Sequence, residues 1–169
     1  MIRDAKAVDI ISIIALLHVA FEKSHYSASG LCQIDVAETK RLLLNAIARH
    51  GGRNGGSCFL QVAENDGRIT GMILGNLQRV YAIGNRLLAT DVFWISLDDG
   101  GPLDGVLLMR NMISWAWSSP AVVEIRCGAT AAIGGDPSRA GGILKTLGMT
   151  EYAHMFRMER KSCLASSTA

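Results

Sequence analysis

The sequence predicts a mixed α/β domain, and three features support this fold class. Segments with helical spacing of apolar residues alternate with short apolar runs that are typical of strands. An Asn-Asp-Gly turn at 65–67 joins two of these runs as a hairpin. The segment 102–118 is long enough to be a helical crossover between two parallel strands. The 169 residues fit a single domain, which we place at 1–160, with a flexible tail at 161–169.

The first third of the chain predicts one short strand and two amphipathic helices. Apolar residues recur every three or four positions in both helical segments. Asp35, three residues before Glu38, resembles a capping box at the start of the second helix. In chain order we expect a strand at 2–3, a helix at 7–23, a loop at 24–34, a helix at 35–50 and a glycine-rich connection at 51–56.

The rest of the chain predicts five strands and two helices. Pro102 is suited to the first turn of a helix, and Gly148 is suited to end one. In chain order we expect strands at 58–63, 69–77 and 87–97, a helix at 102–118, a strand at 121–127, a helix at 137–147 and a last strand at 151–160.

Composition narrows the classes of function. Apolar residues make up 49% and charged residues 19%, which predicts a globular protein. A net charge of +2 is too small to indicate a nucleic-acid partner. The most apolar run, 10–21, is too short to span a membrane and has no cleavage-site flank, so we expect a cytoplasmic protein without a membrane partner. The scattered cysteines and histidines predict no metal site, and a homodimer is left open.

Several local motifs, taken in order, are similar to the GNAT class, the GCN5-related N-acetyltransferases. The resemblance covers about 1–160 and rests on the start Ile2-Arg3-x-Ala5 with Asp9 behind it, the hairpin 67–73 and the segment 144–149. A narrower likeness, at 79–84 and 88–93, is to GNAT-like proteins of tailed phages and prophages. The resemblance implies a twisted mixed sheet flanked by helices, with a splay between the fourth and fifth strands. It also implies acetyl-CoA as acyl donor.

The resemblance also implies a cofactor site at the end of the fourth strand. Backbone groups of Ile95 and Ser96 would hold the pantetheine arm, and the next loop would hold the pyrophosphate at a helix N-terminus. The loop residues in these positions are Gly100, Gly101, Leu103 and Gly105, of which only Gly105 matches the usual Q/R-x-x-G-x-G/A pattern. Two carboxylates, Asp98 and Asp99, would repel a pyrophosphate. The alternative is a plain strand-to-helix turn.

Asp91 is the candidate general base. By strand alternation it shares a face with Ala89, Phe93 and Ile95, beside the expected thioester. The alternative is an ion pair with Arg86.

The general acid of the family is a tyrosine at the position of Leu144, so another group would have to protonate the thiolate. Candidates are Tyr81, which we place in the site, and Tyr152 and His154, although each is more often a packing residue.

The acceptor is an unidentified amine, a small molecule or a protein. Ser24, His25 and Tyr26 lie between the first two helices, where the family binds its acceptor, and a solvated loop is the alternative. The first hypothesis is therefore an acyl-CoA-dependent N-acyltransferase that works by direct attack in a ternary complex. The second is a GNAT-fold protein without catalysis, acting as a binding or virion component. A third hypothesis, a small nucleotide-binding module, is not supported by any Walker or dinucleotide-binding motif in the sequence.

Overall fold

A five-stranded sheet forms the centre of the protein in the computed structural model, which describes residues 1–30, 32–53, 56–129, 137–153, 155 and 158. Its order is β1 (Ile2–Asp4), β2 (Cys58–Asn65), β3 (Arg68–Arg79), β4 (Leu87–Ser96) and β5 (Val122–Arg126). Neighbouring strands are antiparallel except β4 and β5, which are parallel. The mixed sheet confirms the predicted fold class.

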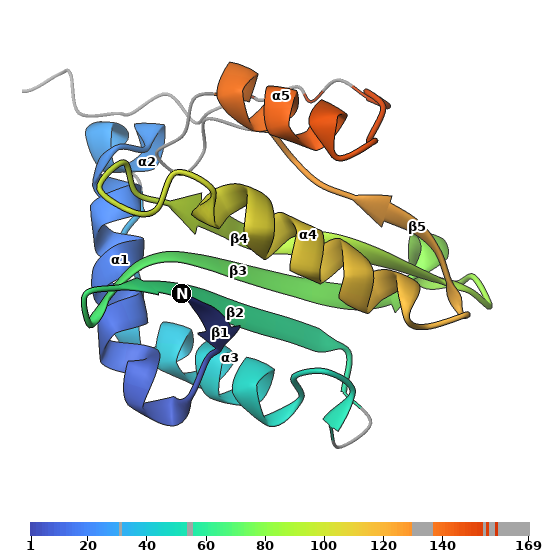
Figure 1. The fold of residues 1–169 in the computed structure, drawn as a ribbon, viewed down its shortest axis with the longest axis horizontal. Helices are drawn as coiled ribbons and strands as arrows, with labels where there is room; N and C mark the ends of the chain where they lie inside the picture. Colours follow the sequence, from blue (N-terminus) through green and yellow to red (C-terminus); the bar gives the residue numbers. More distant parts are fainter. Residues whose placement is uncertain (31, 54–55, 130–136, 154, 156–157, 159–169) are drawn as a thin grey trace, which may run out of the picture.

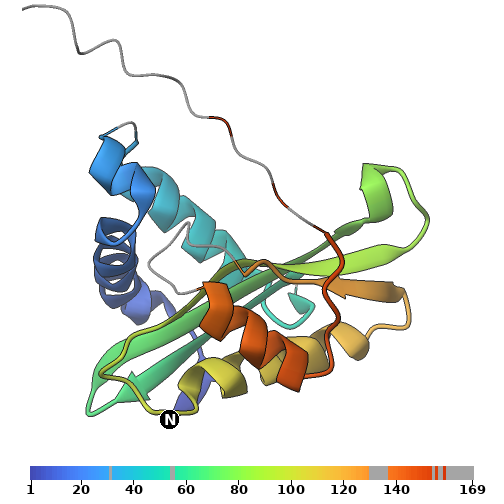
Figure 2. The same ribbon diagram turned by 90° about the horizontal axis from the view of Figure 1, so that it is seen from above.

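Helices cover both faces of this sheet (Figures 1 and 2). On one face, α1 (Ile10–Glu22) and α3 (Val36–Ala48) pack on a core that includes Ile13, Leu43, Leu60, Val62 and Leu74. On the other, α4 (Asp104–Trp117) and α5 (Pro137–Thr146) pack on a core that includes Phe59, Ile73, Leu108, Met109 and Met112. Because both faces are covered, β2 and β3 carry apolar residues on either side and lack simple alternation.

The predicted hairpin is present between β2 and β3. Asp66 and Gly67 adopt φ angles of 50° and 75°, the left-handed values that a tight two-residue turn requires. The helix that follows β4 returns the chain to β5, as expected for a parallel crossover.

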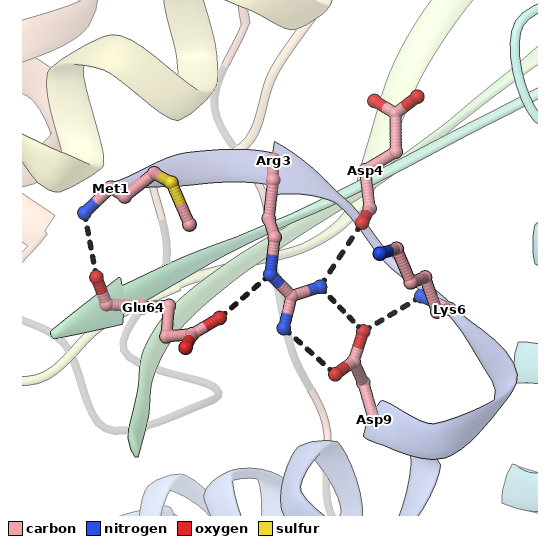
Figure 3. Close-up of polar contacts among 6 residues, drawn as sticks. All are labelled: Met1, Arg3, Asp4, Lys6, Asp9 and Glu64. Atoms are coloured by element: carbon pink, nitrogen blue, oxygen red, sulfur yellow. Dashed lines mark hydrogen bonds and ion pairs between the residues drawn. The ribbon is translucent and has the colours of Figure 1, made fainter. Parts of the chain in front are cut away.

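An ion-pair network fixes the first strand to the first helix (Figure 3). The Arg3 guanidinium donates to both carboxylate oxygens of Asp9, at 2.7 and 2.8 Å, and to Glu64 at 2.7 Å. Asp9 also accepts from the backbone N–H of Lys6 at 2.7 Å, ahead of the short 3₁₀ turn Ala7–Asp9 that leads into α1. The residues that carry the family likeness at the N-terminus therefore have a structural role.

Two segments differ from the prediction. The expected loop at 24–34 contains a short helix, α2 (His25–Ser29), because Ser24 caps its first turn and Gly30 ends it with φ at 66°. The expected last strand at 151–160 lies partly outside the described residues, and the predicted tail at 161–169 lies entirely outside them. Its described residues Glu151, Tyr152 and Ala153 belong to no strand.

Candidate functional site

The strands β4 and β5 separate partway along their length. Their register runs from Leu87 opposite Val122 to Thr90 opposite Arg126, and β5 ends there. β4 continues for six more residues and is paired there only with β3. The separation that we predicted near Ile95 is therefore present, and it begins at Asp91.

A β-bulge next to Asp91 reverses the faces of the sheet to which the following side chains of β4 point. Leu74 of β3 lies opposite Phe93, whereas the next residue, Gly75, lies opposite Asp91, so Val92 is extra. As a result Ala89 packs toward α4, while Phe93 and Ile95 pack with the core under α1 and α3. Our prediction that these residues share one face with Asp91 was wrong for Phe93 and Ile95, because the bulge shifts the alternation.

The free edge of β4 presents backbone amides to the gap. Leu97 donates its N–H to the carbonyl of Thr70 on β3 at 2.8 Å. Bonding directions alternate along an antiparallel ladder, so Ile95 also faces β3, whereas Trp94 and Ser96 face the open side. By this alternation the backbone groups of Ser96 lie on the open side and those of Ile95 face β3, so Trp94 has the position that we expected for Ile95.

A cavity of about 270 Å³ lies at the end of this free edge. It is bounded by the end of α1, the end of β4, the start of α4 and α5, which lie together at one end of the molecule (Figure 1). Of the predicted cofactor residues, it is lined by Ile95, Ser96 and Gly105. It is not lined by Gly100, Gly101 or Leu103.

Two basic residues that we did not predict line the cavity, Lys23 from the last turn of α1 and Arg139 from the first turn of α5. They are 116 positions apart in the sequence and belong to no shared motif. Basic residues at helix ends were the signal available, but only the tertiary structure places these two beside the same cavity.

The start of α4 supplies unpaired amides to the cavity. In the described part of the chain no acceptor lies opposite the N–H groups of Gly105 and Val106, as expected for the first turn of a helix. Trp94 holds this turn against β4, because its Nε1 donates to the Gly105 carbonyl at 2.9 Å. Two N–H groups and the helix dipole favour an anion here.

The loop before α4 is folded around its own carboxylate. Gly101 donates its N–H to Asp104 at 2.8 Å, and Gly100 donates to the carbonyl of Leu97 at 3.1 Å. Leu103 is 60% exposed and points away from the core. Gly100 and Gly101, two of the four loop residues predicted to hold a pyrophosphate, are therefore engaged with the chain itself.

The carboxylates that we expected to repel a phosphate are paired with arginines. Asp98 accepts from Arg139 at 3.2 Å, and Asp99 lies 2.7 Å from Arg68. All four side chains are more than half exposed, so these pairs contribute little stability. They do reduce the negative charge at the mouth of the cavity.

Asp91 lies at the point where β4 and β5 part. Its Oδ1 accepts from the backbone N–H of Gly128 at 3.1 Å, in place of a strand-to-strand bond. Burial raises the pKa of Asp91 above its usual range, although the Gly128 hydrogen bond opposes this. Burial also raises the pKa of the adjacent Cys127 thiol to about 12, so that thiol is protonated at neutral pH.

The predicted ion pair of Asp91 with Arg86 is absent, because Arg86 donates instead to the carbonyl of Pro120 at 3.5 Å. Asp91 therefore keeps an unneutralised carboxylate beside the gap, a position suited to accept a proton.

Tyr81 does not join this group. It lies on the turn after β3, is 71% exposed, and its ring centroid is 5.5 Å from the guanidinium carbon of Arg126. Tyr152 contacts the same guanidinium from 5.3 Å. Cys127, the next residue, packs toward α4, so Arg126 points to the opposite face from Asp91. His154 lies outside the described residues.

The predicted acceptor residues have mixed positions. Ser24 is buried, and its Oγ accepts from Ser27 N–H at 3.3 Å, so its role is to cap α2. The rings of His25 and Tyr26 on that short helix are tilted by 39° to each other, with their centroids 3.9 Å apart. Lys23, directly before them, is the member of this segment that lines the cavity.

Neither a metal cluster nor a membrane span is found among the described residues. No three His, Cys, Asp or Glu side chains gather there as a metal ion would need. No helix in that part of the chain has the length and apolar character to cross a membrane.

Comparison with known proteins identifies the fold. No family model matches this sequence, and no curated protein matches it. Solved structures do match over 95% of the chain. One is an acetyltransferase of Trypanosoma brucei, with 14% identity, 99% of its chain covered and a TM-score of 0.63. Another is an aminoglycoside acetyltransferase from a soil metagenome in complex with sisomicin, with 15% identity, 96% of its chain covered and a TM-score of 0.64. A transcriptional regulator of Bacillus halodurans matches equally well, with 16% identity, 99% of its chain covered and a TM-score of 0.66.

Proposed function

We propose that this protein, which has the GNAT fold and an open gap beside β4, is an acyl-CoA-dependent N-acyltransferase. Acetyl-CoA is the donor and an amine is the acceptor. The observation that carries this proposal is the separation of β4 from β5, which leaves the amides of Trp94 and Ser96 free and ends in the cavity beside α4. Unpaired backbone groups inside a protein are costly, so a ligand that pairs with them is favoured.

The residues present fit such a donor. The amides of Trp94 and Ser96 form an edge to which the amides of a pantetheine arm can bind as an added strand would. Among the described residues that line the cavity, the basic ones are Lys23 and Arg139, and the first turn of α4 adds its free N–H groups. The donor, when bound, supplies an acyl thioester.

The gap supports direct transfer. The amine nitrogen attacks the thioester carbonyl carbon, the new C–N bond forms and the C–S bond breaks. Asp91, directly or through water, takes the proton lost by the amine. An N–H on the free edge of β4 stabilises the developing oxyanion.

The leaving thiolate takes its proton from water in this mechanism. Leu144, at the position of the usual tyrosine, is buried in the core under α4 and has no proton to give. Tyr81 is on the other face of the sheet, and so we no longer assign it the role of general acid. A thiol pKa of about 8.5 makes the thiolate a fair leaving group without help.

Isothermal titration with acetyl-CoA tests the proposal. We expect saturable binding, and the Arg139→Ala variant should bind about tenfold more weakly because one charged contact is lost. Arg41→Ala is the matched control, because Arg41 is as exposed as Arg139, pairs with Glu38 on α3 and does not line the cavity. Absence of binding at millimolar acetyl-CoA would favour a non-catalytic binding protein instead.

A further inference from the structure

Hydrogen bonds within the loop before α4 leave few donors for a phosphate. The N–H of Gly100 is used by Leu97, and that of Gly101 is used by Asp104. Pro102 has no N–H to offer. The loop thus lacks the run of free amides with which glycine-rich loops surround a diphosphate.

A buried carboxylate already occupies this loop. Asp104 is only 7% exposed, and its Oδ2 accepts from Gly101 at 2.8 Å and from Asn65 Nδ2 at 2.8 Å. Asn65 also donates to the Thr70 hydroxyl at 2.7 Å, which ties the carboxylate to β3. The packing is tight, because a Cβ at position 101 would lie 2.8 Å from Asp104 Oδ1. A second anion at the same place would be repelled.

The groups that remain free suit one phosphate. Where the start of α4 lines the cavity these are the N–H groups of Gly105 and Val106, with Lys23 and Arg139 also in the lining and Asp98 as its one carboxylate among the described residues. A cavity of about 270 Å³ is also below the roughly 300–1,000 Å³ of a usual small-ligand site. It has room for a phosphate and the start of a flexible arm, so a nucleotide would have to lie outside it.

We propose that this protein recognises its donor through one phosphate, as a 4′-phosphopantetheine thioester, and does not hold the nucleotide end of CoA. This inference rests on the proposed function, because it concerns the donor of that same site. Such a thioester occurs both in acyl-CoA and on acyl carrier proteins, and a site that ignores the nucleotide accepts either source.

Titration with truncated donors tests this. The four ligands are CoA, dephospho-CoA, 4′-phosphopantetheine and pantetheine. We expect 4′-phosphopantetheine to bind within fivefold of CoA and of dephospho-CoA, and pantetheine to bind at least tenfold more weakly. Arg139→Ala should weaken CoA and 4′-phosphopantetheine by the same factor and leave pantetheine unchanged, and Arg41→Ala should change none of them.

The outcomes separate this inference from the proposed function. A CoA affinity more than fivefold above that of 4′-phosphopantetheine would show that the nucleotide is held and would overturn the inference alone. Equal binding of pantetheine would also overturn it, because the phosphate would then contribute nothing. Failure of all four ligands to bind would overturn the proposed function. A transfer assay that compares acetyl-loaded carrier protein with acetyl-CoA as the donor then identifies the source. We expect transfer from both donors.

Discussion

At the scale of single residues, two carboxylates in this protein are perturbed in opposite directions. Asp9 is buried but receives two hydrogen bonds from Arg3, which hold its pKa below the usual range. Asp91 accepts from the backbone N–H of Gly128 and pairs with no cation among the described residues, so burial raises its pKa. The first carboxylate therefore stabilises the fold in its ionised form, and the second costs stability when it is ionised.

Replacing Arg3 should expose the role of the first carboxylate. Arg3→Met leaves Asp9 buried without its partner, and we expect a loss of about 2 kcal/mol, below the roughly 3–5 of a fully buried pair because Arg3 is partly exposed. The pair stabilises the protein fully above pH ~4 and less as pH falls through the lowered pKa, so the loss should shrink in acid. Urea unfolding at several pH values measures it. Arg41→Met, at an exposed pair, should change stability far less than Arg3→Met does.

The second carboxylate predicts the opposite dependence on pH. A raised pKa means that Asp91 favours the folded state below pH ~4 and that this contribution is lost as pH rises through the folded pKa. Asp91→Asn does not titrate, so its melting temperature should rise relative to the native protein across that window. Asp66→Asn, on the exposed hairpin turn, is the control and should show no such trend. Parallel curves for Asp91→Asn and the native protein would contradict the assignment.

The same variant tests catalysis. If Asp91 accepts the proton of the amine, Asp91→Asn should lower the rate of acyl transfer about 10²-fold while the affinity for acetyl-CoA stays the same. A thiol-release assay with the best amine of a panel measures the rate. An unchanged rate would assign the proton to water.

At the scale of elements, the loop before α4 and the helix α5 use glycine for different reasons. Gly101 is required because Asp104 fills the space where a side chain would begin. Gly142, in the middle of α5, has open space where a Cβ would lie, with no other group within 4 Å, and its backbone is helical. The first glycine serves packing, whereas the second only weakens its helix.

Alanine at these two glycines should therefore have opposite effects. Gly101→Ala pushes Asp104 from its hydrogen bond and should destabilise the protein by about 1–2 kcal/mol. Gly142→Ala should stabilise α5 by up to about 1 kcal/mol, because alanine is the better helix former. Urea unfolding compares the two. A neutral Gly101→Ala would mean that Asp104 moves freely and that the loop amide is available to a phosphate.

At the scale of the whole molecule, the sheet is closed on both faces along β2 and β3 and open at one edge of β4. The two cores that sandwich the central strands give a rigid body, and the functional gap lies where the pairing of β4 with β5 stops. Opening a sheet only at its end leaves the amides of the site fixed by a well-packed strand, which orders them before a ligand binds.

Hydrogen exchange measures this arrangement. Amides of β3 and of 61–63 in β2 should exchange most slowly in the free protein, because these stretches have a paired strand on each side. Saturating acetyl-CoA should slow exchange in 92–106 and leave α3 unchanged, since α3 is on the other face (Figure 2). Protection in α3 in place of 92–106 would move the donor site to that face.

Much of the fold was determined by the sequence alone, because its signals are local. Helical periodicity, the Asp66-Gly67 turn and the crossover length predicted nearly all the described elements, and the separation of β4 from β5 followed from the family likeness. The short helix α2 was missed because Gly30 and the serines in 24–34 are typical of a loop, whereas in the structure Ser24 and Gly30 cap the two ends of that helix.

The tertiary structure decided the site. The bulge at Val92 moved Phe93 and Ile95 away from the face of Asp91, and one extra residue opposite a partner strand leaves no mark in a single sequence. Lys23 and Arg139 line the same cavity only because α1 ends and α5 begins beside it. In the sequence Asp104 looks like any acidic residue in the first turn of a helix. Only the fold brings the hydrogen-bond donors of Gly101 and Asn65 to its carboxylate. Periodicity is a property of neighbours in the chain, whereas a binding site depends on distances between segments far apart in it.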